Sequence, residues 1–206
     1  FINPVLAISE ADRNLSSLIY SGLVDLSPEG EVENNLAQEV KISNDRLTYT
    51  VTINENAVYH DDSPVTADDV IFTINKITDP MIKSPKRGNW DGVAVEKVDT
   101  QTLTFTLKQA YTPFIYNLTL GILPKHIWKN VSADEFSFSQ FNTLPIGSGP
   151  YKVSRVERND GGIPNFYNLE ASRVGAGKVS FIENLVFRFY PSETALLEAY
   201  SRKEVE

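Results

Sequence analysis

Apolar and polar residues alternate most clearly at residues 47–53, where every odd position is apolar and every even position is threonine. A period of two places the apolar side chains on one face of a β-strand and the threonines on the other. Residues 40–42 alternate in the same way, and the polar residues 43–46 predict a hairpin loop between the two segments. The predicted hairpin has one buried and one solvated face.

A second hairpin is predicted at residues 93–107. Valines at 93, 95 and 98 precede a polar Asp-Thr-Gln turn, and residues 102–107 then alternate threonine with leucine or phenylalanine. Strands buried on both faces would instead show continuous apolar runs. The two hairpins therefore predict two antiparallel sheets with threonine-rich outer faces.

Helical spacing of apolar residues occurs between the hairpins, at residues 66–77. Thr66 can cap this helix, acidic residues occupy its first turn, and Asp79-Pro80 ends it. The same kinds of signal predict further helices at residues 12–22, 112–118, 125–128 and 192–200.

The last third of the chain is less regularly patterned. Residues 145–151, Pro-Ile-Gly-Ser-Gly-Pro-Tyr, form its strongest cluster of turn residues. A Gly- and Asn-rich stretch follows, and residues 186–190 then predict a strand. We expect a break between two subdomains within residues 145–180.

Composition narrows the possible partners. The chain has 27 acidic and 19 basic residues, a net charge of −8, and shows no basic stripe. A nucleic-acid-binding surface usually needs such a stripe, so nucleic acid is not an expected partner. The absence of cysteine excludes disulfides and thiol chemistry. No apolar run approaches the roughly 18 residues that cross a bilayer.

The most tempting catalytic or metal-binding cluster is His60-Asp61-Asp62, followed by Asp68 and Asp69. A histidine with carboxylates can bind zinc or act as a general base. Such chemistry needs the side chains to converge on one point. Turn formation at 61–64 and helix capping at 68–69 explain the same residues, so we favour a structural role.

Two other segments invite a functional interpretation. The Gly147-Ser148-Gly149 segment lacks the spacing of a nucleophile elbow, and no Lys-Ser/Thr follows it as in a phosphate-binding loop, so it is interpreted as a turn. Trp90 lies in a polar loop and could either stack on a ligand or pack its loop against a sheet. Both interpretations of Trp90 remain open at this point.

The ordered motifs resemble bacterial extracellular solute-binding proteins of family 5, the oligopeptide-, dipeptide- and nickel-binding type that serves ABC importers. The matching segments are 18–24, 36–37, 45–51, 59–70, 98–103, 123–128 and 145–151. Each motif is weak alone, but seven in the same order are specific. Asp62 stands where the family usually has glycine, from which we expect a turn that needs less of a positive φ.

The resemblance implies an α+β fold of the type II periplasmic-binding-protein kind. The expected part is a first lobe, with a mainly antiparallel sheet, short helices and a partial mixed sheet toward the C-terminal end. Residues 1–30 would be the N-terminal segment of lobe one, 31–150 its antiparallel subdomain and 151–206 the return into its mixed α/β part. The second lobe is expected to be absent from this chain, as is the export signal.

The resemblance also implies a function without chemistry: capture of a peptide or similar small solute for delivery to membrane permease subunits. Candidate solute contacts are Ile8, Trp90 and Gly121; no catalytic residue, metal site or cofactor is expected. We expect an extracytoplasmic protein, periplasmic or a cell-surface lipoprotein, that is a monomer. Two rivals remain, namely a hydrolase that uses His60 and the nearby aspartates, and a structural or adhesive surface domain.

Overall fold

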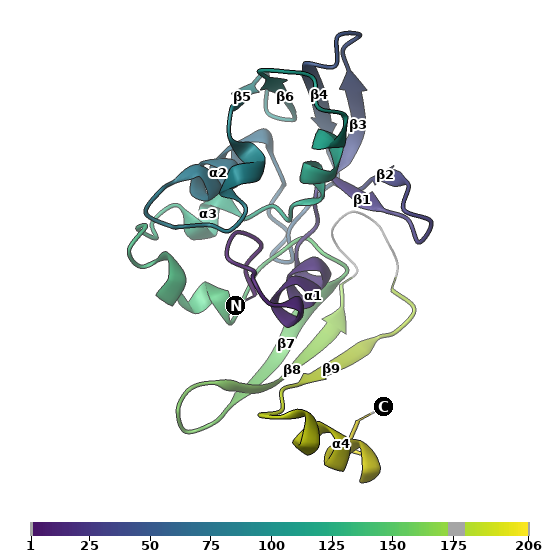
Figure 1. Cartoon of the computed structure of the whole chain (residues 1–206), viewed down its shortest axis with the longest axis vertical. Helices are drawn as coiled ribbons and strands as arrows, with labels where there is room; N and C mark the ends of the chain where they lie inside the picture. The colour runs from purple at the N-terminus through teal and green to yellow at the C-terminus, as the bar shows by residue number, and fades with distance from the viewer. Residues whose placement is uncertain (1, 173–179, 206) are drawn as a thin grey trace.

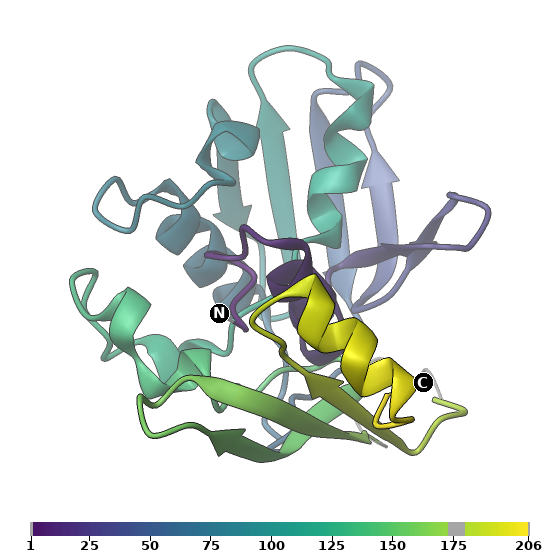
Figure 2. The same cartoon turned by 60° about the horizontal axis from the view of Figure 1, so that its bottom comes forward.

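Helix α1 (Glu10–Ile19) lies between two β-rich parts of the molecule, with a four-stranded sheet above it and a three-stranded sheet below it in Figure 1. The computed structural model describes residues 2–172 and 180–205. Residues 173–179, which fall within the predicted subdomain break, lie outside the described residues. Figure 2 brings the lower sheet forward and shows the four-stranded sheet behind it.

The upper sheet is antiparallel and joins both predicted hairpins. Its strands, in spatial order, are β3 (Ala37–Ile42), β4 (Thr48–Ile53), β6 (Thr102–Leu107) and β5 (Val93–Lys97). The prediction of two separate sheets was wrong, because β4 pairs with β6 and sets Thr50 opposite Thr104. Each isolated hairpin would leave unpaired backbone groups along its inner edge, and this pairing satisfies them.

One face of this sheet carries the core. Tyr49 and Phe105 are buried on it and both contact the ring of Phe114, which lies in the 3₁₀ helix η2 (Thr112–Thr119). Helix α2 (Ala67–Thr78) packs close to β5. The threonines of β4 point to the opposite, partly solvated face, as the alternation predicted.

The predicted helices are confirmed, with α1 beginning earlier than expected. Ser9 caps α1: the Asp12 N–H donates to the Ser9 hydroxyl, and the Asp12 carboxylate accepts from the Ser9 N–H. The other predicted helices correspond to α2, η2, α3 (Lys125–Trp128) and α4 (Glu193–Ser201). Within the described ranges, no helix combines the length and apolar character needed to span a membrane.

The lower sheet consists of β7 (Tyr151–Arg158), β8 (Pro164–Ala171) and β9 (Asn184–Arg188), all paired antiparallel. The expected α+β character is present, but the partial mixed sheet expected here does not occur among the described strands. A short turn joins β7 to β8 and reverses the chain, whereas a parallel pair would need a long crossover.

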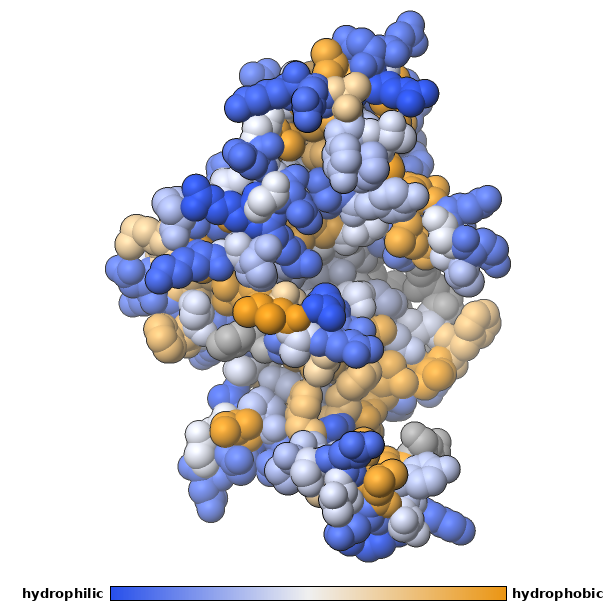
Figure 3. Space-filling view, viewed as in Figure 1, coloured by the Kyte–Doolittle hydropathy of each residue, from blue (hydrophilic) through white to orange (hydrophobic). Residues whose placement is uncertain are grey.

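Smaller elements complete the fold. They are the hairpin of β1 (Val24–Leu26) and β2 (Val32–Asn34) and the 3₁₀ turns η1 (Arg87–Trp90), η3 (Phe136–Phe138) and η4 (Gln140–Asn142). Exposed apolar side chains include Val186 of β9 and Leu197 of α4. Figure 3 shows apolar side chains gathered over the lower sheet.

Candidate functional site

His60, the strongest catalytic candidate in the sequence, is held by backbone groups of the 145–151 segment. Its Nδ1 accepts from the Gly147 N–H at 3.2 Å, and its Nε2 lies 3.0 Å from the Gly149 carbonyl oxygen. An accepting Nδ1 and a donating Nε2 describe a neutral imidazole. Burial lowers the pKa of His60 below its usual value of 6.5, which favours the same neutral form.

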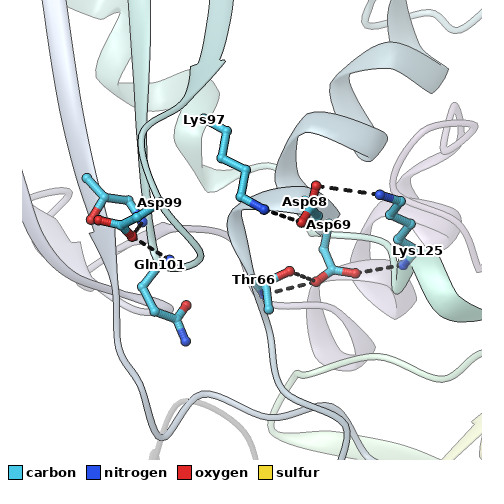
Figure 4. A network of polar contacts seen from close by, with 8 residues as sticks. Thr66, Asp68, Asp69, Lys97, Asp99, Gln101 and Lys125 are labelled. Atoms are coloured by element: carbon cyan, nitrogen blue, oxygen red, sulfur yellow. Dashed lines mark hydrogen bonds and ion pairs between the residues drawn. The ribbon is translucent and has the colours of Figure 1, made fainter.

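The aspartates near His60 make hydrogen bonds and ion pairs with different partners. Asp61 accepts a 2.7 Å hydrogen bond from His126 Nε2. Figure 4 shows Asp68 between the ammonium groups of Lys97 and Lys125. One oxygen of Asp69 accepts from both the backbone N–H and the hydroxyl of Thr66, and the other accepts from the Lys125 N–H.

These contacts support the structural interpretation of the cluster. Among the described residues, no group of three or more His, Asp or Glu side chains is placed to hold a metal ion. Thr66, which precedes α2, donates two hydrogen bonds to the Asp69 carboxylate in the first turn of that helix. The cluster therefore contributes turn, cap and ion-pair contacts, and the hydrolase alternative has no convergent site in this part of the chain.

The glycines of the 145–151 segment allow it to lie directly on the end of α1. A Cβ on Gly147 would clash with the Ile19 carbonyl oxygen, and one on Gly149 would lie 2.4 Å from the Leu18 carbonyl oxygen. The Gly149 N–H donates to the Ile19 carbonyl at 2.8 Å. The interpretation of 147–149 as a structural turn agrees with this packing, because no side chain larger than hydrogen fits there.

Beside this junction is a cavity of about 310 Å³. Its wall is built from segments distant in sequence: the N-terminal residues, one side of α1, the loop around η1, the end of η2 and residues 148–150. Cavities of roughly this size accept small ligands. The polar lining residues include Arg13, Ser17, Lys86, Asn89 and Asn117.

Trp90 packs its loop against the upper sheet, which is one of the two roles that the sequence left open. It is only 4% exposed and its ring packs near Phe105 and Phe114, with centroid distances of 5.9 and 5.8 Å. Trp90 also lines the cavity. It ties the η1 loop to the sheet, and its contact with a solute stays a prediction.

The other two candidates lie in different settings. Gly121 lines the cavity, where a Cβ would lie 2.6 Å from Tyr20 Cβ. Ile8 is 71% exposed and is not among the lining residues, although its neighbour Ala7 is. Solute contact at both positions stays a prediction.

Two basic residues of the wall, Arg13 and Lys86, were not predicted as site residues. Arg13 lies on α1 and Lys86 immediately precedes η1, so 73 positions separate them in the chain. From the sequence, only the positive charge of each residue is apparent. Tertiary packing brings these two residues to the wall of the same cavity.

The chain has the fold of the type II periplasmic binding proteins, to whose solved structures it is similar over 98–100% of its length. The chain belongs to the bacterial extracellular solute-binding proteins, family 5: the family model described as "Bacterial extracellular solute-binding proteins, family 5 Middle" matches residues 31–206. The recognition made from the sequence motifs is thereby confirmed.

Named relatives agree with this assignment. The oligopeptide-binding protein AppA of Bacillus subtilis is 27% identical over 197 residues, which cover 94% of this chain and 35% of AppA. The structure of NikZ from Campylobacter jejuni with Ni(L-His) has a TM-score of 0.85 at 26% identity and covers 100% of this chain and 40% of NikZ. The ABC transporter substrate binding protein CtaP of Listeria monocytogenes has a TM-score of 0.83 at 33% identity, covering 99% of this chain and 41% of CtaP. The chain thus spans about 35–41% of the length of these relatives.

Proposed function

We propose that this chain forms part of the first lobe of a protein that captures a peptide or similar small solute and delivers it to the permease of an ABC importer. The family and its named relatives are solute-binding proteins. The solute would lie between two lobes, and closure of the lobes would bury it. The segments 1–30, 31–150 and 151–206 are proposed as the N-terminal segment, the antiparallel subdomain and the return segment of this lobe.

The cavity is the observation that carries the proposal for this chain. It brings Trp90 and Gly121, two of the three predicted solute contacts, into one wall. Ile8 is proposed as a contact at the exposed end of the segment that reaches the cavity through Ala7. Trp90 offers a large, rigid surface for a solute, and the neighbouring amides of Asn89 and Asn117 offer hydrogen bonds.

The proposed role involves no bond making or breaking, so we propose that the protein is not an enzyme. We further propose an extracytoplasmic location, periplasmic or lipid-anchored at the cell surface, and a monomeric state. The net charge of −8 supports the view that nucleic acid is not a partner. These proposals are supported by the family to which the chain belongs and by its fold.

A bulky residue at the cavity wall tests the solute site. Ser17 and Asn14 are both exposed on α1, but only Ser17 lines the cavity. In the intact protein containing this chain, Ser17→Phe should weaken retention of a short-peptide mixture by about tenfold, as loss of a well-fitted contact does. Asn14→Phe is the matched control and should bind as the unmodified protein does.

Binding would be measured by native mass spectrometry and calorimetry. Unchanged retention of peptides by the Ser17→Phe variant would show that the solute does not bind in this cavity. Failure of the unmodified protein to retain any peptide would exclude a peptide as its solute.

A further inference from the structure

Two tyrosine hydroxyl groups lie in the core without a hydrogen-bond partner in the protein. Tyr20 and Tyr59 are both buried, and neither hydroxyl has a partner among residues 2–172 and 180–205. The two hydroxyls therefore do not bond to one another. A hydroxyl that loses its hydrogen bonds to solvent on burial and gains none costs free energy. Buried polar side chains almost always have a partner, so both hydroxyls call for one.

The backbones of the two tyrosines are held by the same short segment. Tyr20 follows the last residue of α1, whose carbonyl accepts from the Gly149 N–H at 2.8 Å. Tyr59 precedes His60, whose N–H donates to the Gly147 carbonyl at 2.8 Å. Each tyrosine is therefore one position away from a residue that is bonded to the 145–151 segment.

The electrostatics of the core place the two hydroxyls near each other. Burial raises the pKa of both tyrosines, and Asp69 and Tyr20 raise the pKa of Tyr59 further. Such an effect weakens with distance, so the Tyr20 hydroxyl lies close to that of Tyr59. Both hydroxyls stay protonated at neutral pH, and each can donate one hydrogen bond and accept others.

The polar side chains around Tyr59 have other partners. One oxygen of Asp69 takes part in the cap of α2, and the other accepts from the Lys125 N–H. The ring of His126 lies against that of Tyr59 at a centroid distance of 5.8 Å, and its Nε2 is bonded to Asp61. These groups do not satisfy the Tyr59 hydroxyl, which leaves a small donor and acceptor from solvent as its partner.

We propose that one water molecule is bound in the core between the Tyr20 and Tyr59 hydroxyls and forms a hydrogen bond with each. A water molecule donates two hydrogen bonds and accepts two, so it can serve two hydroxyls that do not reach each other. Internal waters are held at such places, where they join buried polar groups that have no other partner.

The water site lies behind the cavity described above. Tyr20 lines that cavity, while its hydroxyl is buried. The bound water therefore connects the cavity wall at the end of α1 to the segment that begins at Tyr59. The inference goes beyond the proposed function and does not depend on it, because it concerns only groups within the core.

The first test is a crystal structure of the intact protein containing this chain, at a resolution that shows ordered water. One water molecule should lie within about 3 Å of both hydroxyl oxygens. Well-defined tyrosines with no water between them, or a direct hydrogen bond from one hydroxyl to the other, would overturn the proposal.

The second test is urea unfolding of tyrosine variants of the intact protein. Tyr20→Phe and Tyr59→Phe each remove one partner of the water and otherwise keep the shape of the core. Each should raise the unfolding equilibrium constant by about fivefold, the effect of one ordinary hydrogen bond. The double variant should raise it by less than the product of the two single effects, because both substitutions act on the same water.

Tyr111→Phe is the matched control, because Tyr111 is exposed, and it should leave the unfolding equilibrium constant unchanged. If the two buried hydroxyls had no partner at all, Tyr20→Phe and Tyr59→Phe would leave the stability unchanged or raise it, since each removes an unsatisfied polar group. That result would also overturn the proposal. Should a variant fail to fold, the crystal structure of the unmodified protein decides the question by itself.

Discussion

His60 and Gly147 are joined by two hydrogen bonds in opposite directions: the His60 backbone N–H donates to the Gly147 carbonyl at 2.8 Å, and the Gly147 N–H donates to His60 Nδ1 at 3.2 Å. The His60 ring also reaches the Gly149 carbonyl. Two of the motifs by which the family is recognised therefore meet in space. Because Gly147 and Gly149 also lie on the end of α1, this contact joins the N-terminal helix to the subdomain above it.

Removal of the His60 side chain should therefore destabilise the fold. His60→Ala leaves the Gly147 N–H and the Gly149 carbonyl without their partner in a largely buried place, which we expect to cost about 1–3 kcal/mol. Urea unfolding of the chain would measure the loss. His126→Ala removes an exposed histidine that pairs with Asp61 and should cost less than about 1 kcal/mol. Equal effects of the two variants would contradict the role assigned to His60.

The glycines of the same segment give a steric prediction. Gly149→Ala would place a Cβ 2.4 Å from the Leu18 carbonyl oxygen, and the helix end must move to admit it. We expect a loss of about 1–3 kcal/mol or more, the range found when a packed site is overfilled. Gly88→Ala is the control, because a Cβ at Gly88 meets nothing within 4 Å. Thermal unfolding of both variants would compare them, and a stable Gly149→Ala protein would show that the close approach is not required.

Much of the fold could be predicted from local sequence pattern. Threonine alternation identified β4 and β6, and capping residues with prolines located α2 and η2. The pairing of β4 with β6 could not be predicted, because it depends on contacts between residues about 50 positions apart. Strands β7 and β8 were missed because their apolar residues are irregularly spaced and few of them are buried.

The candidate site was less predictable than the fold. Trp90 and Gly121 were chosen from loops, and the structure places them in one cavity wall. Arg13 and Lys86 were not predicted as site residues, because a basic residue on a helix, or a few of them in a loop, is ordinary for a solvated surface. Their significance comes from the tertiary contacts that bring the two segments together.

The turn at Asp62 corrects one expectation and supplies another prediction. An aspartate there suggested a turn that needs less of a positive φ, but Asp62 has a φ of 65°. Asp tolerates this left-handed conformation better than most residues, yet glycine adopts it without a steric cost. Asp62 is exposed, so Asp62→Gly should stabilise the chain by about 0.5–1 kcal/mol. Asp61→Gly, which removes the His126 partner instead, should not stabilise it, and calorimetric unfolding would compare the two.

The neutral state of His60 predicts a dependence of stability on pH. Its folded pKa is lowered by burial, so the unfolded chain binds the proton more readily than the folded chain does. Stability then rises with pH wherever the unfolded state holds more protons. The contribution of His60 is fully present above the unfolded value of 6.5 and is lost as the pH falls from there toward the lower folded pKa.

Urea unfolding at pH 7.5 and at pH 5.5 would measure this loss. These two pH values separate the effect of His60 from that of the carboxylates, because lowered pKa values make the aspartates titrate at more acidic pH. The aspartates concerned are Asp45, Asp61, Asp68 and Asp99. His60→Gln removes the titrating group, so the difference in unfolding free energy between the two pH values should shrink. His126→Gln keeps the buried histidine and should retain the His60 contribution. A His60→Gln protein with the same pH dependence as the unmodified chain would show that another group is responsible.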